Sequence, residues 1–248
     1  YDPTEGLVPD LADHYEISDD HKMYTFYLRQ NVAWHDGKSL IAQDVIFTIN
    51  AIQNREYRSP LFVSWSGVGV EQLDDYTVRF TLAEPFAPFL SLNTVGILPA
   101  HIWQDINPNN AELTELNKKP IGSGPYKFEK LTKDSKGTIK SYTIKRNDEY
   151  YNGDIYLERI NFKFYNDISE ALTALKNRQV EGLGFVPLQE ISGLAHDKEV
   201  QFIYPTLPQY TAVFFNEKHQ PILSDALVRE ALVLSTDKNA IIQKALFG

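Results

Sequence analysis

Apolar and polar residues alternate regularly over residues 22–30, KMYTFYLRQ. A period of two places Tyr24, Phe26 and Leu28 on one face, which predicts a strand with one side toward a core. Over residues 41–54, IAQDVIFTINAIQN, the apolar residues instead recur at helical spacing. This change of period predicts an amphipathic helix after the strand.

The middle of the chain continues with patterns that are typical of strands. Residues 68–85 predict a hairpin that turns at Asp74–Asp75, because the apolar residues on its returning half share a face. Alternation around a polar turn that contains Gly137 predicts a second pair of strands. The strands predicted after the hairpin lie at 122–131, 138–147 and 158–165.

The last third of the chain mixes helices with a strand. Residues 167–182 predict a helix that has Asp167 as its N-cap and Glu170 as the second member of a capping box. The other predicted elements are a strand at 210–216 and two helices that begin near Ser224–Asp225 and Thr236–Asp237. Hairpins combined with isolated helices, without regular βαβ alternation, indicate the α/β fold class with a mixed sheet and α+β character.

The composition allows a sizeable core and excludes several chemistries. The chain has 248 residues, 43% of them hydrophobic, and no cysteine. Disulfides, thiolate-bound zinc, iron–sulfur centres and thiol nucleophiles are therefore excluded. A formal net charge of −9 argues against nucleic-acid binding. No run of about 18 apolar residues is present, so no transmembrane helix is predicted.

His35 and Asp36 lie on a turn between the first strand and the first helix and are the first candidates for chemistry. A catalytic pair requires a carboxylate that orients the imidazole. Adjacent residues at the exit of a strand point in different directions, and Asp36–Gly37 is a strong turn dipeptide because glycine adopts positive φ. A structural turn is therefore favoured, and a hydrolase that uses His35 or a carboxylate stays open as an alternative.

No other motif predicts catalysis or a cofactor. GSGPY, residues 122–126, does not suit a phosphate loop, because Pro125 removes an N–H donor and a strand pattern follows. The six histidines lack the spacing of metal ligands, so we expect no metal site and no cofactor. The many aromatic residues fit a core or a groove for a peptide or sugar. A ligand-binding protein is thus favoured over an enzyme.

A series of motifs in fixed order points to a known family. Residues 7–49 contain P-x-LA, YTF-x-LR, WHDG and A-x-DV in that order. Further motifs of the series lie at 83–90, 97–103, 120–128, 146–153 and 214–232. Over essentially its whole length the chain resembles the family 5 extracellular solute-binding proteins of ABC importers, which include oligopeptide-, dipeptide- and nickel-binding members.

The resemblance implies a periplasmic-binding-protein-like type II clamshell, in which two lobes close over a ligand. Because family chains extend beyond this one, we expect only the N-terminal lobe here, cut from a longer protein at both ends, with lobe II absent. Residues 1–40 and 120–248 would form the core subdomain of lobe I. Residues 41–119 would form a smaller, inserted subdomain.

The function implied by the resemblance is that of a receptor, with no enzymatic activity. The chain would capture an oligopeptide or dipeptide outside the membrane and deliver it to an ABC permease. Same-family alternatives are a nickel chelate, haem, a sugar or a peptide pheromone. We expect a monomer in the periplasm or outside the cell, and attachment as a cell-surface lipoprotein is a further option.

The resemblance also suggests which residues face the ligand, through backbone groups, an Asn amide and apolar side chains. The expected ligand-facing residues are Leu61, Phe62, Asn93, Thr94, Phe215 and Asn216. The alternative for each is packing in the core or on the surface. One departure from the family pattern is Ile41, which replaces a capping Thr, so we expect Ser39 to cap the helix over 41–54.

Overall fold

The structure is a computed structural model that describes residue 2 and residues 5–195, 199–205 and 212–245. The chain divides into two compact units, Tyr1–Phe164 and Tyr165–Gly248, called unit 1 and unit 2 below. All strands of the described residues belong to unit 1, and the regular structure described in unit 2 is helical. The described helices include none with the length and apolar character needed to cross a bilayer.

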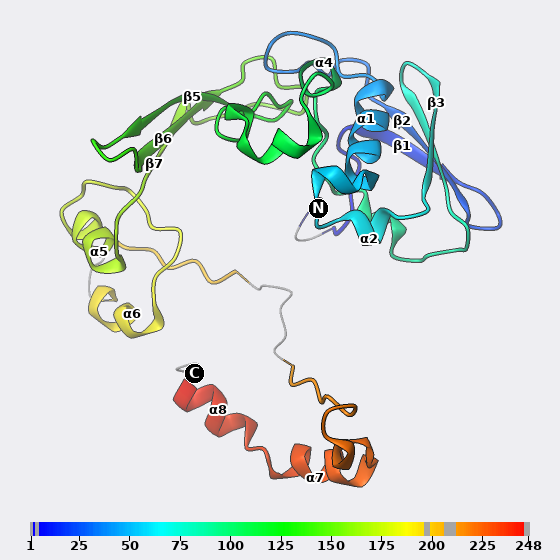
Figure 1. The fold of residues 1–248 in the computed structure, drawn as a ribbon. Coiled ribbons are helices and arrows are strands. Elements are labelled where there is room, and N and C mark those ends of the chain that lie inside the picture. Colours follow the sequence, from blue (N-terminus) through cyan, green and yellow to red (C-terminus); the bar gives the residue numbers. More distant parts are fainter. Residues whose placement is uncertain (1, 3–4, 196–198, 206–211, 246–248) are drawn as a thin grey trace. The chain divides into compact units, whose positions relative to one another are not determined.

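A four-stranded antiparallel sheet forms the first part of unit 1 (Figure 1). Its strands are β1 (Ala12–Ile17), β2 (Met23–Leu28), β3 (Gly69–Asp74) and β4 (Thr77–Thr81). They lie in the order β1-β2-β4-β3, which confirms the predicted strand over 22–30 and the predicted hairpin over 68–85. β1 is an additional strand that the sequence pattern does not predict, because most of its residues, of either polarity, are exposed.

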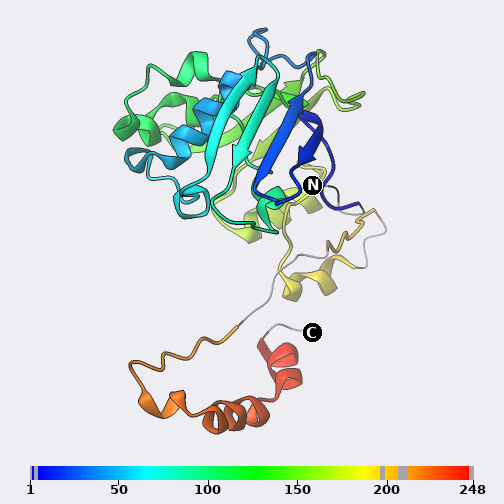
Figure 2. The same cartoon turned by 90° about the vertical axis from the view of Figure 1, so that its right-hand side faces the viewer.

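One face of this sheet is buried beneath α1 (Ala42–Gln53), as Figure 2 shows. Across β2 and β4, Tyr24 pairs with Phe80 and Phe26 with Val78, and β4 presents both of its residues to the core. The predicted helix over 41–54 is confirmed by α1. The residues of α1 that join the main hydrophobic cluster are Ala42, Val45, Ile49 and Ile52.

Unit 1 also contains short helices, two of which contribute buried aromatic rings to this core. The α-helical turns are α2 (Phe62–Trp65), α3 (Phe89–Leu92) and α4 (Ala100–Trp103). The 3₁₀ helices are η1 (Arg55–Tyr57), η2 (Pro108–Leu113) and η3 (Glu115–Asn117). The rings of Trp65 and Phe89 lie 5.8 Å apart and are almost fully buried, so α2 and α3 meet through aromatic contacts.

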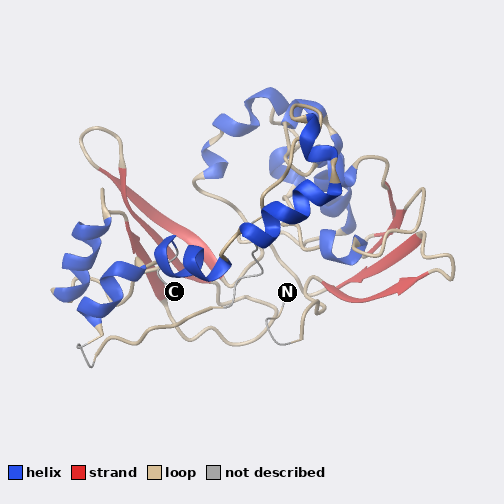
Figure 3. Ribbon diagram, turned by 90° about the horizontal axis from the view of Figure 1, so that it is seen from below, coloured by secondary structure: helices blue, strands red, loops and turns tan. Residues whose placement is uncertain are grey.

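A separate three-stranded antiparallel sheet completes unit 1 (Figure 3). Its strands are β5 (Tyr126–Lys133), β6 (Ile139–Arg146) and β7 (Arg159–Lys163), which confirms the three strands predicted here. Gly137 lies in the turn between β5 and β6 at a φ of +85°, a left-handed conformation that glycine adopts without steric cost.

The four-stranded sheet contains residues from both predicted subdomains of unit 1. β1 and β2 belong to residues 1–40, whereas β3 and β4 belong to residues 41–119, and β2 pairs directly with β4. The two segments are therefore joined by backbone hydrogen bonds within one sheet. The assignment of 1–40 and 120–248 to a core subdomain of lobe I stays a prediction.

Unit 2 begins with α5 (Ile168–Lys176), which confirms the helix predicted over 167–182 but ends earlier. Asp167 Oδ1 accepts a hydrogen bond from the Glu170 N–H at 2.9 Å, as expected of an N-cap. The reciprocal half of the predicted capping box is wrong, because Glu170 Oε2 accepts from the N–H of Asn166 instead. Arg178 has a positive φ of 56° just beyond the helix, and this left-handed residue ends it.

Three more α-helices and a 3₁₀ helix follow in unit 2. They are α6 (Leu188–Leu194), η4 (Pro221–Ser224), α7 (Ala226–Ser235) and α8 (Lys238–Ala245). Asp225 accepts from the Leu227 N–H at the start of α7, and Asp237 accepts from the Ala240 N–H at the start of α8. Both helices predicted from these two aspartates are confirmed. α6 is not among the predicted elements.

The strand predicted at 210–216 is wrong over residues 212–216, which form neither strand nor helix. Residues 210 and 211 lie outside the described part of the chain. Phe214 is 87% exposed, so the apolar pattern that suggested a strand is not matched by burial. Alternation predicts an extended backbone, but a strand also needs a neighbouring edge with which to pair.

Candidate functional site

An apolar cavity of about 240 Å³ lies in unit 1 against the buried face of the four-stranded sheet. Its walls come from residues 7–12, from the sheet, from α1, from Trp65 of α2 and from the segment between Leu90 and Ile97. β2 and β4 contribute alternate residues because side chains on one face recur with a period of two, and β1 contributes two residues on either side of a register shift. Those residues are Ala12, Tyr15, Phe26, Leu28, Val78 and Phe80.

Buried polar groups of α1 hold the wall that runs from Leu90 to Ile97. Asp44, which is 4% exposed, accepts from the backbone N–H of Ala100 at 2.8 Å. Thr48 accepts from the N–H of Leu98 at 2.9 Å and donates to the Asp44 carbonyl at 2.7 Å. The two side chains, one turn apart on α1, therefore fix the end of the segment that lines the cavity.

Asp44, in the A-x-DV motif, also contacts the WHDG motif through Trp34. Its Oδ2 accepts from the Trp34 indole N–H at 3.1 Å and from the Ile41 backbone N–H at 3.0 Å. Ile41, and not Ser39, is the N-cap residue of α1, so the prediction of a Ser39 cap is wrong. The Asp44 carboxylate accepts from the N–H of this N-cap residue, which is the reciprocal contact of a capping box. With these partners the buried carboxyl group of Asp44 is satisfied by hydrogen bonds, so its role is structural.

The opposite wall, residues 7–12, is fastened to distant parts of unit 1. The Tyr151 hydroxyl donates to Asp10 Oδ1 at 2.5 Å, and Arg29 Nε donates to the Asp10 carbonyl at 2.7 Å. Burial, and next the hydrogen bond to Asp10, raise the pKa of Tyr151, so this hydroxyl stays protonated and able to donate. The contacts hold the N-terminal wall in place over the sheet.

The polar groups on the cavity wall are few, and their hydrogen bonds are local. Asn93 Nδ2 donates to the Phe89 carbonyl at 2.8 Å, and the Thr94 hydroxyl donates to the Ser91 carbonyl at 2.9 Å. Asp10 is the carboxylate on the wall, and Tyr151 already occupies one of its oxygens. The cavity is therefore suited to binding an apolar group and offers no acid–base pair for catalysis.

The two other predicted residues of unit 1 lie beside the cavity and not on its wall. Leu61 is exposed just before α2, and the ring of Phe62 packs under the Arg55 guanidinium, 5.2 Å from ring centroid to Cζ. Trp65, at the other end of α2, is the residue of this helix that lines the cavity. The structure thus brings Asn93 and Thr94 together at the cavity and leaves Leu61 and Phe62 on the neighbouring surface.

Phe215 and Asn216 belong to unit 2, where both lie before a turn. Asn216 is exposed, and its Oδ1 accepts from the His219 N–H at 3.1 Å. Phe215 is partly buried. Whether any of the six predicted residues contacts a ligand stays a prediction.

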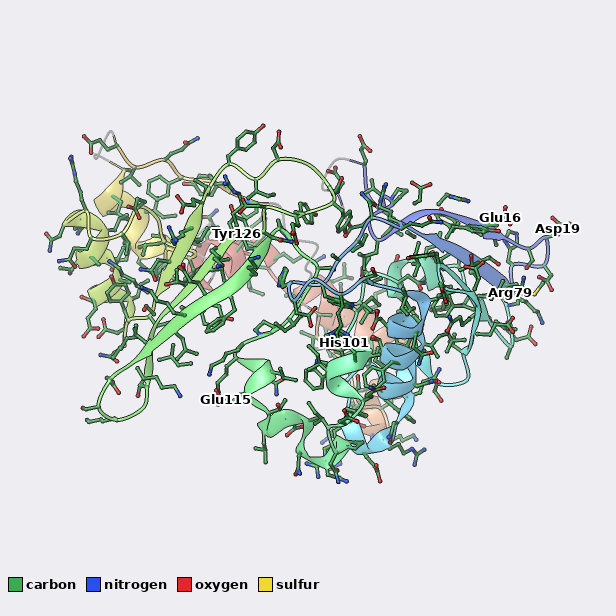
Figure 4. The ribbon with its side chains drawn as sticks, turned by 90° about the horizontal axis from the view of Figure 1, so that it is seen from above. Glu16, Asp19, Arg79, His101, Glu115 and Tyr126 are labelled. Carbon is green, nitrogen blue, oxygen red and sulfur yellow. The ribbon has the colours of Figure 1, made fainter. Side chains whose placement is uncertain are left out.

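The His35–Asp36 turn has the geometry of a fold corner. Asp36 Oδ2 accepts from His101 Nε2 of α4 at 2.7 Å, whereas His35 contacts Gly122 and Gly124. The two neighbours point to different partners, so Asp36 does not orient His35. Figure 4 shows His101 on α4 beside α1, and Tyr126 at the start of β5.

Gly37 adopts a φ of +87°, which confirms the predicted Asp36–Gly37 turn. In the part of the chain that the structure describes, no group of three or more His, Asp or Glu side chains is arranged to hold a metal ion.

The comparisons with known proteins assign the chain. A model of the bacterial extracellular solute-binding proteins, family 5 Middle, matches residues 6–248. The chain belongs to this family. The resemblance inferred from the ordered motifs is therefore confirmed.

Two curated relatives carry names that indicate peptides. The dipeptide-binding protein of Escherichia coli (strain K12) is 27% identical over 266 residues, which cover 99% of this chain and 48% of the relative. The oligopeptide-binding protein AppA of Bacillus subtilis (strain 168) is 29% identical over 242 residues, which cover 96% of this chain and 43% of the relative. The chain spans about half the length of the curated relatives it matches.

Solved structures of family members have the same fold. NikZ from Campylobacter jejuni in complex with Ni(L-His) matches with a TM-score of 0.80 and 32% identity, over 96% of this chain and 47% of NikZ. AppA from B. subtilis in complex with a nonapeptide matches with a TM-score of 0.77 and 28% identity, over 96% of this chain and 47% of AppA. The predicted fold class, an α/β chain corresponding to one lobe of such proteins, is confirmed.

Sequence reasoning missed the residues that position the site. The sequence pattern gives Asp44 no role beyond the A-x-DV motif, and it gives Thr48 and Tyr151 none. The available signal was a pair of polar residues, Asp44 and Thr48, on the helix face that also carries Val45 and Ile49. Polar residues on a buried face require partners, so they indicate a second segment packed against the helix.

Proposed function

We propose that this chain is part of the substrate-binding component of an ABC importer, which captures peptides outside the membrane and passes them to a permease. The observation that carries the proposal is the family match over residues 6–248, together with relatives named for dipeptides and oligopeptides. The cavity agrees with this role, because its walls suit binding and contain no catalytic pair. The protein would act as a monomeric receptor and not as an enzyme.

The proposed ligand surface of unit 1 combines the cavity with the residues at the start of α2. An apolar side chain of a peptide would fit against the sheet face, and Asn93 and Thr94 would lie at its polar margin. Leu61 and Phe62 of unit 1 would add apolar contact. Asn216 belongs to unit 2 and is proposed separately, as a group that hydrogen-bonds an extended peptide backbone. Residues of the longer protein would complete the surface and enclose the ligand.

A calorimetric comparison tests this function. A mixture of short and longer peptides is titrated into the 248-residue chain and into a longer protein that contains it. Because enclosure between two halves supplies much of the affinity, we expect a Kd of about 1 mM or weaker for the chain and about 1 μM for the longer protein. Tight binding by the 248-residue chain alone would contradict the need for enclosure.

Two variants of the longer protein test whether Asn216 contacts the ligand. Asn216→Asp keeps the Oδ1 acceptor used by His219 but loses the amide donor, so weaker peptide binding with an unchanged melting temperature supports a ligand contact. The control is Leu113→Ala, because Leu113 is 79% exposed and belongs to η2, away from the cavity wall. Unchanged affinity in Asn216→Asp removes Asn216 from the site.

A nickel chelate is the second candidate ligand, because NikZ in complex with Ni(L-His) matches this chain with a TM-score of 0.80. The same titration with Ni(L-His) in place of peptides separates the two ligands. Binding of Ni(L-His) and of none of the peptides would favour the second candidate. Hydrolysis of the peptides during the titration would contradict a receptor function altogether.

A further inference from the structure

His35 connects two segments of unit 1 that are far apart in the sequence. Its backbone N–H donates to the Gly122 carbonyl at 2.8 Å. Its ring makes two more hydrogen bonds to the same loop, since Nδ1 accepts from the Gly122 N–H at 3.1 Å and Nε2 lies 3.0 Å from the Gly124 carbonyl. One residue of the turn thus holds residues 122–124, the loop that leads into β5.

The partners of the ring determine its protonation. A backbone N–H only donates, so Nδ1 of His35 must be unprotonated where it meets Gly122. A backbone carbonyl only accepts, so Nε2 must carry the hydrogen that reaches Gly124. The ring is therefore neutral and in the Nε2–H tautomer. In the imidazolium form Nδ1 would also carry a hydrogen, and two donors would face each other.

The surroundings leave the loop little freedom to adapt to a charged ring. A Cβ added to Gly122 would lie 3.4 Å from His35 Cε1, so the ring already packs tightly on the glycine. The Gly124 carbonyl also accepts from Asn147 Nδ2 at 3.3 Å, and the Asn147 N–H donates to the Pro125 carbonyl at 2.8 Å. The end of β6 is therefore fastened to the same loop.

We propose that His35 is a pH-sensitive latch, which holds residues 122–124 against the turn at His35–Gly37 only while its imidazole is neutral. Protonation removes the hydrogen bond from Gly122 and places two N–H groups in opposition. The loop before β5 then loosens from the turn. This role is independent of which solute the protein binds.

The surroundings of the His35 ring include groups that raise its pKa and groups that lower it. Burial lowers the pKa of His35, the Gly124 carbonyl raises it, Lys127 of β5 lowers it and Asp36 raises it, with a net lowering. Asp36 is itself paired with His101 of α4 at 2.7 Å. The neutral ring is thus favoured at neutral pH.

The sign of the pH effect follows from this lowered pKa. The unfolded chain takes up the proton near the ordinary value of 6.5, whereas the folded chain takes it up at lower pH. The stabilisation by His35 is therefore complete above 6.5 and is lost as pH falls from there through the lower, folded pKa. Each unit between the two values corresponds to about a tenfold change in the folding equilibrium.

An NMR titration of the unmodified 248-residue chain tests the latch directly. We expect the His35 ring to show the Nε2–H tautomer at pH 7.5 and to titrate below 6.5. We also expect the amide protons of Gly122 and Gly124 to shift along the same curve. An Nδ1–H tautomer, or a midpoint at or above 6.5, would overturn the proposal.

Paired variants test the consequence for stability. His35→Gln keeps one donor and one acceptor but does not titrate, so its melting temperature should fall less between pH 7.5 and pH 5 than that of the unmodified chain. His219→Gln is the matched control, because His219 is exposed in unit 2, and its pH dependence should equal that of the unmodified chain. The latch is refuted if His35→Gln loses as many degrees on acidification as the unmodified chain.

Discussion

α1 of unit 1 and α7 of unit 2 are both amphipathic helices, yet their surroundings differ. α1 buries Val45, Ile49 and four other residues of its inner face along with Asp44, whereas α7 buries none of its residues. Ile49 is 1% exposed, and Leu234 of α7 is 79% exposed. A helical pattern of apolar residues thus indicates that a helix forms, while its burial depends on what the rest of the chain packs against it.

The same contrast extends to polar residues at the starts of the helices. Asp225 caps α7 through one nearby N–H, a contact that requires only local chain geometry. Asp44 of α1 joins Trp34, Ile41 and Ala100, and so organises a large part of unit 1. A carboxylate near a helix start can therefore act as a local cap or as a link between distant segments.

The largest expected effect comes from Asp44→Ala. Removal of the carboxylate leaves three N–H donors without their acceptor, two of them buried and that of Ile41 partly buried, so the free energy of unfolding should fall by about 3–5 kcal/mol. Asp225→Ala should cost about 1 kcal/mol, as for an ordinary N-cap. Urea unfolding followed by tryptophan fluorescence measures the first variant, because every tryptophan lies in unit 1, and far-UV circular dichroism measures the second. Equal losses of unfolding free energy in Asp44→Ala and Asp225→Ala would contradict the distinction between a carboxylate that links distant segments and one that only caps a helix.

Truncating one apolar side chain on each helix tests the difference in burial between α1 and α7. Ile49→Ala should lower the free energy of unfolding by about 2–4 kcal/mol, because it opens a cavity in the core. Leu234→Ala should change it by no more than about 0.5 kcal/mol, since the side chain is exposed. The same two unfolding measurements apply. A large loss for Leu234→Ala would show that α7 is covered in solution.

Thr48→Val tests whether α1 holds the cavity wall through the Thr48 hydroxyl. The substitution keeps the shape but removes the acceptor for the Leu98 N–H, so we expect a loss of about 1–2 kcal/mol. Hydrogen exchange at Leu98 should accelerate, whereas exchange at Leu227, whose acceptor is Asp225, serves as the internal control. Unchanged protection of Leu98 would mean that Thr48 does not hold this segment.

The smallest expected effect concerns acid unfolding at Asp36. Burial opposes its ionisation, but hydrogen bonds from His101 and from the Lys38 N–H outweigh it and lower the pKa of Asp36 below 3.8. Its stabilisation is therefore present above 3.8 and is lost as pH falls through the lowered pKa. Thermal melts from pH 5 to pH 2.5 should show a shallower decline for Asp36→Asn than for the unmodified chain. Asp19→Asn, at an exposed turn, is the control.

Predictions from the sequence succeeded where neighbours along the chain determine the structure. The alternation of Tyr24, Phe26 and Leu28 correctly predicted a strand. Three aspartates correctly predicted the starts of helices, namely Asp167, Asp225 and Asp237. They failed where burial or pairing was decisive. β1 is mostly exposed, so its residues do not alternate between apolar and polar as a half-buried strand would. Residues 212–216 have a strand-like pattern of apolar residues but form no strand.

The candidate site was predictable only in part. The family pattern led to Asn93 and Thr94, which lie on the cavity wall, and to Leu61 and Phe62, which lie beside it. Nothing in the local sequence distinguishes the two pairs. The distinction arises because α2 turns Trp65 toward the cavity and because α1 fixes the segment before Ala100.

The sequence by itself determined the family, the lack of cysteine chemistry and the local elements, since these depend on composition, ordered motifs and residues within a turn of one another. The tertiary structure alone decided the cavity, the role of Asp44 and the contacts of His35. These rest on hydrogen bonds between residues separated by 56 positions for Asp44 and Ala100, 87 for His35 and Gly122, and 141 for Asp10 and Tyr151. Such pairs meet only through the packing of distant segments of unit 1, because closing a long loop costs entropy that local pattern does not offset.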